Sequence, residues 1–434
     1  MISPSIDRPS VIVAPPACAP RIWHLLALVI ALVWCGGAKP PPKSDAPPPT
    51  GVPYEGIDAK EMKALVGKSV DLIPLKGKTI KNVELVKLTP GKQPGVLQSI
   101  AFKSEGGPTR NLRAATVARL VAGTRFYDVI ADRQKKGAFM LVDIERRDAL
   151  VNARLEKKGG YSLWPVLTAD EQDKALDENK EFLKKIDNAI PNRKFQLHET
   201  SYYLFYTDIP EGDVAPIIAN LDSMYLTLGQ KFGVYEGTNI WHGKAMIVVF
   251  STKDLFARFE KIVMEIPDVG DSQGFYHPSY NGDVLTACAV GDDAAFFVSV
   301  LIHDTARSYM FRYRSNVYLP AWVSEGIAEW VTASVLPNNR FSRSRQEKAA
   351  ETARSIGSLD GFFDVKNLKS WQYGVASSVA DILIKTDAQA YRALIQGIKE
   401  GQTWEESLQD SYGLSSADVI QLYANQIGVP SLRP

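Results

Sequence analysis

Two apolar stretches in the C-terminal third constrain the fold of this 434-residue chain more than any other feature. The first, residues 296–314, reads FFVSVLIHDTARSYMFRYR and predicts a helix that is apolar around most of its circumference. The second begins after Leu319-Pro320 and reads AWVSEGIAEWVTASV, and proline suits the first turn of a helix. Gly326 and Ala328 are small, so a neighbouring helix can approach this one closely. The chain therefore needs a sizeable core around the two helices.

The composition is that of an ordinary globular protein, because hydrophobic residues make up 45% and charged residues 23% of the chain. The length allows two or three domains of about 100–200 residues. Lys and Arg number 50 and Asp and Glu number 49, so the net charge of +1 gives no reason to expect nucleic acid as a partner. Cys18, Cys35 and Cys288 have no metal-ligand spacing, and three cysteines exclude a fold stapled by disulfides.

The first 38 residues predict a signal for export. Residues 22–34, IWHLLALVIALVW, follow Arg21 and are shorter than the roughly 20 apolar residues of a membrane span. In one interpretation Cys35 carries the lipid of a bacterial lipoprotein. In another, residues 36–38 mark an ordinary signal-peptidase site, and in a third the segment stays as an uncleaved anchor. Residues 39–53 are rich in proline and predict an extended tether. We expect a location in the bacterial cell envelope, in the periplasm or attached to a membrane.

Residues 54–165 predict a small β-rich domain. Residues 83–88 and 97–102 alternate apolar and polar side chains, and residues 125–130 and 139–143 read as two further short strands. Short strands with polar turns between them are typical of a small barrel or a curled sheet. We interpret this region as an accessory or spacing domain, because no catalytic pattern falls within it.

Residues 166–194 predict a helical connector. Thr168 can cap its helix, and Glu171 three residues later completes a capping box. Leu183 and Ile186 lie at helical spacing on one side.

Residues 195–434 predict an α+β domain with a mainly helical C-terminal part, because strands come first and helices afterwards. A turn around residues 281–283 joins the last two expected strands. The expected strands are residues 201–206, 245–250, 274–276 and 284–289, and the expected helices before the apolar pair are residues 214–232 and 255–262.

Ionisable residues on the two apolar helices follow the pattern of a mononuclear zinc peptidase. In such a site two histidines at i and i+4 bind the metal from one helical face, and a glutamate beside the first histidine is the general base. A third ligand comes from a second helix and leaves the fourth position open for water. Here His303 and Arg307 hold the i and i+4 positions, and Asp304 holds the position of the base. Glu325 follows on the second helix.

The segments LIHDTARSYMFRY and LPAWVSEGIAEW together resemble the gluzincin, or peptidase MA-like, zinc metallopeptidases, and more narrowly a bacterial envelope branch of that family. The resemblance covers residues 195–434 and implies a gluzincin-like fold. It implies that His303 matches the first zinc ligand and Glu325 the third, while Glu329 matches a second acidic residue of that helix. By the same resemblance Tyr373 matches a tyrosine that assists the tetrahedral intermediate in some members.

Two residues depart from the family's pattern and predict a damaged metal site. Asp304 stands where the family has its base glutamate, and Arg307 stands where it has the second histidine. Arginine stays protonated and has no lone pair to offer a metal. His303 and Glu325 alone fall short of the three protein ligands of a catalytic zinc. We predict that the Arg307 guanidinium takes the place of the metal and pairs with Glu325 and Asp304.

The leading functional prediction is a catalytically inactive pseudopeptidase that keeps a cleft for a peptide or protein ligand and has no cofactor. The second is an active zinc peptidase with atypical ligands, for which His277 is a candidate because it follows a strand that runs along the substrate cleft in the family. The third is a structural protein of the cell envelope, in which Asp304 and Arg307 form a plain ion pair within one helix. No nucleic acid is expected as a partner, and any membrane attachment would come through the N-terminus.

Overall fold

A computed structural model describes residues 55–75, 78–91, 96–131, 137–235 and 237–434. The chain divides into two compact units, which we call the barrel unit (Pro49–Leu163) and the C-terminal unit (Trp164–Pro434). The predicted signal and tether, residues 1–53, lie outside the described residues. Within the described residues, no helix is both long enough and apolar enough to cross a membrane.

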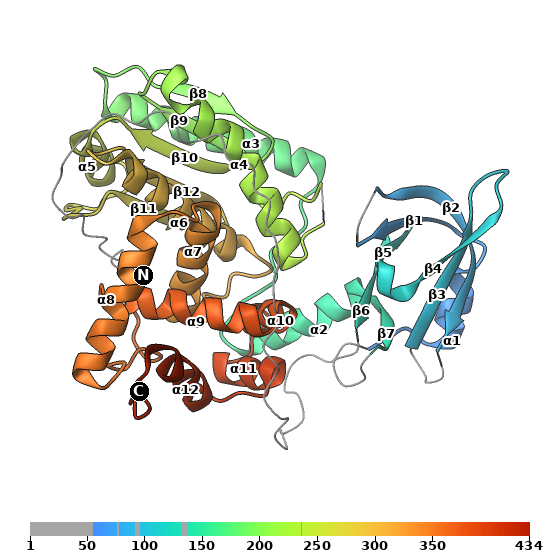
Figure 1. Ribbon diagram of the computed structural model, residues 1–434. Helices are drawn as coiled ribbons and strands as arrows, with labels where there is room; N and C mark the ends of the chain where they lie inside the picture. The colour runs from blue at the N-terminus through green and yellow to red at the C-terminus, as the bar shows by residue number, and fades with distance from the viewer. Residues whose placement is uncertain (1–54, 76–77, 92–95, 132–136, 236) are drawn as a thin grey trace. The chain divides into compact units, whose positions relative to one another are not determined.

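The barrel unit is a sheet of seven strands in the order β2-β1-β5-β6-β7-β3-β4 (Figure 1). Pairing of β2 with β3 closes the ring, and β7 and β4 pair with successive parts of β3. Of the two predicted alternatives, a small barrel or a curled sheet, the structure therefore shows the barrel. Its elements are α1 (Ala59–Leu65), β1 (Ser69–Pro74), β2 (Ile80–Pro90), β3 (Val96–Lys103), β4 (Thr109–Arg113), η1 (Ala114–Thr116), β5 (Val117–Ala122), β6 (Arg125–Ala131), β7 (Phe139–Asp143) and α2 (Ile144–Lys157).

Side-chain alternation in β2 and β3 builds the inside of this barrel. Leu85 lies opposite Phe102 and Leu88 lies opposite Ile100, and all four side chains are buried. Successive side chains of a strand point to opposite faces. Lys87 and Ala101, which lie opposite each other between these four, are therefore on the outer face of the barrel.

The C-terminal unit is built around a mixed sheet of five strands in the order β11-β12-β10-β9-β8 (Figure 1). Strands β9, β10 and β12 run parallel, while β8 and β11 are antiparallel at the two ends of the sheet. The strands are β8 (Gln196–Glu199), β9 (Tyr203–Thr207), β10 (Ala245–Phe250), β11 (Gly274–Pro278) and β12 (Val284–Ala289).

The predicted separation of strands from helices holds only after β12. Parallel neighbours need a crossover connection, which is usually a helix. Helix α4 (Glu211–Phe232) lies in the chain between the parallel strands β9 and β10, and α5 (Lys253–Ile262) lies between β10 and β11. The sequence pattern predicted both helices. It did not predict the parallel pairing of β9 with β10, which requires α4 as a crossover.

Helices cover both faces of the five-stranded sheet. On one face Leu204 and Met246 pack against Leu183 of α3 (Ala169–Ala189) and Phe256 of α5. On the other face, side chains of β9, β10 and β12 join α4 and the later helices in the largest apolar cluster. The capping box that Thr168 predicts for α3 is present. Helix α3 therefore belongs to the core of the C-terminal unit and is more than a connector.

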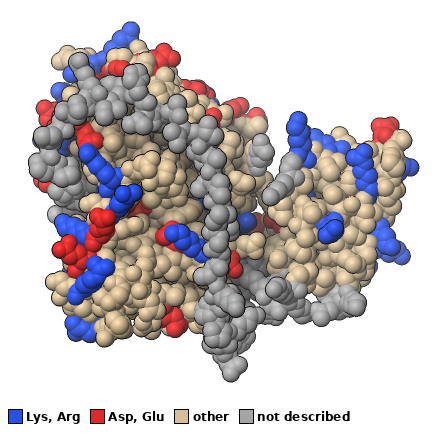
Figure 2. All heavy atoms as spheres, in the orientation of Figure 1, with Lys and Arg blue, Asp and Glu red and all other residues tan. Residues whose placement is uncertain are grey.

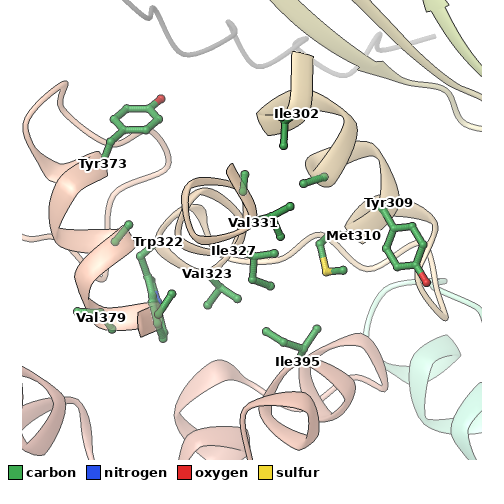
Figure 3. Packing of buried hydrophobic residues seen from close by; sticks show 14 of the residues in the cluster. Ile302, Tyr309, Met310, Trp322, Val323, Ile327, Val331, Tyr373, Val379 and Ile395 are labelled. Carbon is green, nitrogen blue, oxygen red and sulfur yellow. The ribbon is translucent and has the colours of Figure 1, made fainter. Parts of the chain in front are cut away.

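The chain after β12 is mainly helical, as expected. Helix α7 packs between α6, α9 and α10, and Figure 3 shows its apolar side chains, including Ile327, among those of the three neighbours. A Cβ atom at Gly326 would lie 2.7 Å from the Ala376 carbonyl oxygen of α9, so the predicted close approach is real. These helices are α6 (Ala294–Arg312), α7 (Ala321–Val335), α8 (Arg340–Ile356), α9 (Gln372–Thr386), α10 (Ala388–Lys399), α11 (Trp404–Tyr412) and α12 (Ser416–Ile427).

Candidate functional site

The residues that the sequence singled out on the two apolar helices meet where α6 packs against α7. His303, Asp304 and Arg307 belong to α6, and Glu325 and Glu329 belong to α7. Residues four apart share one face of a helix, which brings both glutamates toward α6. Four of the five are buried, while the side chain of Arg307 is 17% exposed. The site is therefore a buried cluster of charges with one cation at its rim.

His303 lies between carboxylates on both sides of its ring. Its Nδ1 atom is 3.2 Å from Asp304 Oδ1, and its Nε2 atom is 3.2 Å from Glu325 Oε2 and 3.7 Å from Glu329 Oε1. Burial lowers the pKa of His303, but the hydrogen bonds to Asp304 and Glu325 and the charge of Glu329 outweigh burial and raise it to about 9. The ring is therefore a cation at neutral pH, hydrogen-bonded to Asp304 through Nδ1 and ion-paired with Glu325 through Nε2.

Arg307 adds a second cation beside the same carboxylates. Its Nη2 atom is 3.2 Å from Glu325 Oε1, and its Nη1 atom is 3.8 Å from Asp304 Oδ1. Its Cζ atom lies 4.4 Å from the centre of the Tyr276 ring, which is within the range of a cation–π contact. Burial works against the charge, but Glu325, Tyr276 and Asp304 outweigh it and hold the pKa of Arg307 above its usual value.

A third cation completes the cluster from α8. Arg345 forms an ion pair with Glu329, whose side chain is fully buried. His303, Arg307 and Arg345 thus face Asp304 and the two glutamates of α7, which balances three positive groups against three negative ones. A buried carboxylate is costly unless it is paired and hydrogen-bonded. This balance explains how α6 and α7 hold so many charges in an apolar core.

Strand β11 borders the cluster from the sheet. Gly274 and Tyr276 lie two residues apart on one face of the strand, and Tyr276 contacts Arg307. A Cβ atom at Gly274 would lie 2.6 Å from Val300 Cγ1 and 3.1 Å from Asp304 Oδ2, so a larger residue would force α6 away. Burial raises the pKa of Tyr276 to about 12, which keeps its phenol protonated.

Tyr373 lies in the first turn of α9 and is buried. It is among the groups that act on the pKa of Arg307, which places it near the cluster. In Figure 3 its phenol points away from the apolar side chains of Val323 and Ile327. The role of Tyr373 in assisting a reaction stays a prediction from the family resemblance.

His277 lies on the other face of β11, away from the cluster. Its Nε2 atom is 3.0 Å from Glu260 Oε1 of α5, and its ring contacts Phe275 on that side. Because neighbouring residues of a strand point to opposite faces, Tyr276 faces α6 while His277 faces α5. The alternative in which His277 supplies a missing zinc ligand is therefore contradicted.

The residues present do not fit a catalytic zinc. His303 and Glu325 lie close enough to share one ion, but the i+4 position after His303, where the zinc-peptidase pattern has a second histidine, is filled by a guanidinium, which repels a metal cation. In the part of the chain that the structure describes, no three histidine, cysteine, aspartate or glutamate side chains form a group able to hold a metal. Cys288 is free and buried on β12, and burial raises the pKa of its thiol.

Sequence reasoning missed the contacts of Tyr276 and Arg345. The strand pattern of residues 274–276 carried a signal for Tyr276, because alternation puts it on the same face as the small Gly274. No sequence pattern predicted the contact of Arg345, because its ion pair with Glu329 depends on how α8 packs against α7.

In comparisons with known proteins, no protein-family model and no curated protein matches the chain.

Proposed function

We propose that the C-terminal unit is a metallopeptidase-like domain of the gluzincin type that binds peptide segments without hydrolysing them, with Arg307 in the place of the metal. One observation carries this proposal. The Glu325 carboxylate lies 3.2 Å from His303 Nε2 through one oxygen and 3.2 Å from Arg307 Nη2 through the other. A carboxylate that matches a zinc ligand of the family thus holds two cationic side chains.

The chemistry of these groups supports binding over hydrolysis. Zinc would polarise a peptide carbonyl and lower the pKa of a bound water to about 7. Arg307 can donate hydrogen bonds to a carbonyl or carboxylate oxygen, but it cannot convert water into hydroxide. Asp304, in the position of the base, lies against His303 and Arg307 and is held by two cations. This carboxylate is therefore committed to ion pairs with side chains of the cluster.

The end of the sheet offers the surface for a peptide. Strand β11 is the last strand on its side of the five-stranded sheet, and the matching strand of the resembled family runs along the substrate cleft. Tyr276 on this strand lies over Arg307. Tyr318 is 60% exposed and acts on the pKa of Tyr276, which places a second phenol nearby. A peptide along β11 would meet aromatic rings and one rim cation.

Binding and cleavage of an unfolded protein test the proposal together. We expect the full chain to bind fluorescent peptides from an unstructured protein and to leave them intact during long incubation with zinc. Tyr276→Ala removes an aromatic contact and should weaken binding about tenfold, the usual effect of losing an interface anchor. Tyr280→Ala is the matched control, since Tyr280 is fully exposed at the turn between β11 and β12. Cleavage by the wild type, or equal binding by both variants, would overturn the proposal.

A further inference from the structure

The near-neutral chain consists of two oppositely charged parts. Residues 49–163, which form the barrel unit, contain 21 Lys and Arg against 12 Asp and Glu, a net charge of +9. Residues 164–434 contain 25 Lys and Arg against 35 Asp and Glu, a net charge of −10. On the face of the barrel unit that Figure 2 presents, basic side chains clearly outnumber acidic ones. Charge asymmetry of this size between parts of a chain points to a polyanionic partner for the basic part.

Strand register gathers part of this charge on one face. Lys87 of β2 lies opposite Ala101 of β3, and Lys103 of β3 lies opposite Thr109 of β4. Arg113 of β4 lies opposite Ser99 of β3. All three cations are on the side of their strands that faces away from the buried residues of the barrel. Neighbouring strands are about 4.8 Å apart, so the three charges share a compact patch, which we call the basic face.

The basic face is exposed and has little acid to neutralise it. Lys87, Lys103 and Arg113 are exposed, and among the described residues none of them forms an ion pair. Glu84, opposite Lys103, is the single acidic residue at these outward positions of β2, β3 and β4. Cations elsewhere on the barrel do have partners, such as Arg119 with Asp128 at 2.6 Å. The cations of the basic face thus remain available to an external anion.

We infer that the basic face binds the anionic phospholipid headgroups of a bilayer, an inference that does not depend on the proposed peptide binding. Residues 35–54, which separate the apolar segment 22–34 from the barrel, can span at most about 70 Å, so a bilayer holding that segment would keep the barrel close to its surface. Each Lys or Arg near an anionic surface contributes about 1 kcal/mol of binding. The acidic C-terminal unit is repelled by the same surface.

The chemistry of the basic face favours a lipid surface over a nucleic acid. Proteins that bind single strands stack bases on aromatic side chains. The other described outward residues of this face are small and polar or small and apolar, and none is aromatic: Thr89, Ser99, Ala101, Thr109 and Asn111. Such residues suit headgroup phosphates, which hydroxyl and amide groups can hydrogen-bond.

Vesicle partitioning of the full chain tests this inference. We expect tighter binding to vesicles with about 30% phosphatidylglycerol than to pure phosphatidylcholine vesicles, and we expect 0.5 M salt to remove the difference, since screening shortens the reach of charge to about 4 Å. Reversing Lys87, Lys103 and Arg113 to Glu should reduce the preference for anionic vesicles by more than about a hundredfold, because loss of the three cations alone, at about 1 kcal/mol each, accounts for that factor. Insertion of the N-terminal apolar segment would contribute to binding of both vesicle types, so its contribution cancels in the ratio of the two affinities.

A matched charge reversal separates the basic face from net charge. Arg193, Lys194 and Lys261 are exposed residues of the C-terminal unit, and changing them to Glu alters the net charge of the chain by the same amount. This control should keep the vesicle preference. Equal wild-type binding to both vesicle types, an equal loss in the control, or preferential binding of the wild type to single-stranded DNA over anionic vesicles would each overturn the inference.

Discussion

Two groups of cations, one in each unit of this protein, are held in opposite ways. In the C-terminal unit His303, Arg307 and Arg345 lie among carboxylates that are buried between α6, α7 and α8. In the barrel unit Lys87 and Lys103 are exposed on a sheet face, and no ion pair involves them among the described residues. The first arrangement fixes side chains relative to one another, while the second leaves charge free to act on something outside the chain.

This difference changes what each charge contributes. A buried ion pair contributes little net stability when intact, but loss of one partner leaves a charge stranded in a medium of low dielectric constant. An exposed cation stabilises the fold hardly at all and acts over a screening length of about 8 Å at physiological salt. Substitutions in the C-terminal cluster should therefore change stability, and substitutions on the basic face should change binding.

The largest effect is expected for Glu325→Ala. It removes the carboxylate shared by His303 and Arg307 and should lower the free energy of unfolding of the C-terminal unit by about 3–5 kcal/mol. Chemical denaturation followed by intrinsic fluorescence measures this change. Glu84→Ala on the outer face of the barrel is the control and should stay within about 0.5 kcal/mol of wild type. Equal effects of the two substitutions would contradict the statement that the buried carboxylates, unlike the exposed ones, determine stability.

A smaller loss is expected for Arg345→Met. Among the described residues, Glu329 would then keep His303, 3.7 Å away, as its cationic neighbour, and the free energy of unfolding should fall by about 2–3 kcal/mol. Arg343→Met on the same helix is the control, because Arg343 is exposed. A loss in the control that matches that of Arg345→Met would show that α8 stability, and not the ion pair with Glu329, is being measured.

The third largest effect is expected for a substitution at the contact between α7, which carries the glutamates, and α9. Gly326→Ala would place a Cβ atom 2.7 Å from the Ala376 carbonyl oxygen, and we expect a loss of about 1–3 kcal/mol in thermal or chemical unfolding. Gly212→Ala, in the first turn of α4, would meet no atom within 4 Å and should be neutral or slightly stabilising. An unchanged stability of Gly326→Ala would mean that α7 and α9 can separate without cost.

The smallest effect concerns an exposed ion pair within the C-terminal unit. Hydrogen bonds from Lys180 and Lys244 lower the pKa of Glu199 below 4.5. The resulting stabilisation is complete above pH 4.5 and is lost as the pH falls through the lowered pKa of the folded state. Glu199→Gln should therefore lower stability at neutral pH by less than about 1 kcal/mol and reduce the acid dependence below pH 4.5. The free energy of unfolding, measured as a function of pH, checks this prediction. A loss above about 3 kcal/mol at neutral pH would show that this exposed pair contributes as much to stability as the buried ones.

Local patterns in the sequence predicted most of the elements. Alternation located strands such as β2 and β3, and the capping box of Thr168 and Glu171 located the start of α3. The i and i+4 positions of His303 and Arg307 predicted that the two side chains share one face of their helix. That this face would meet Glu325 was predicted from the metallopeptidase pattern and not from spacing, and both side chains do lie beside Glu325. Features within one helix or one strand were therefore accessible before the structure.

Features that depend on how distant elements meet were not accessible in the same way. The parallel pairing of β9, β10 and β12 is set by crossover connections, and the contact of Arg345 with Glu329 is set by the path of α8. The opposite charges of the two units were hidden by the whole-chain net charge of +1 and emerged once the boundary between the units was placed.

The zinc content of the purified full chain tests the central claim most directly. Wild type and Arg307→His would be exposed to zinc, dialysed and analysed for metal, with Arg307→Lys as a variant that keeps the positive charge. We expect wild type and Arg307→Lys to be free of zinc and Arg307→His to retain about one ion per chain, since it restores a third neutral or anionic ligand. One tightly held zinc ion in the wild type would contradict the claim that Arg307 stands in the place of the metal.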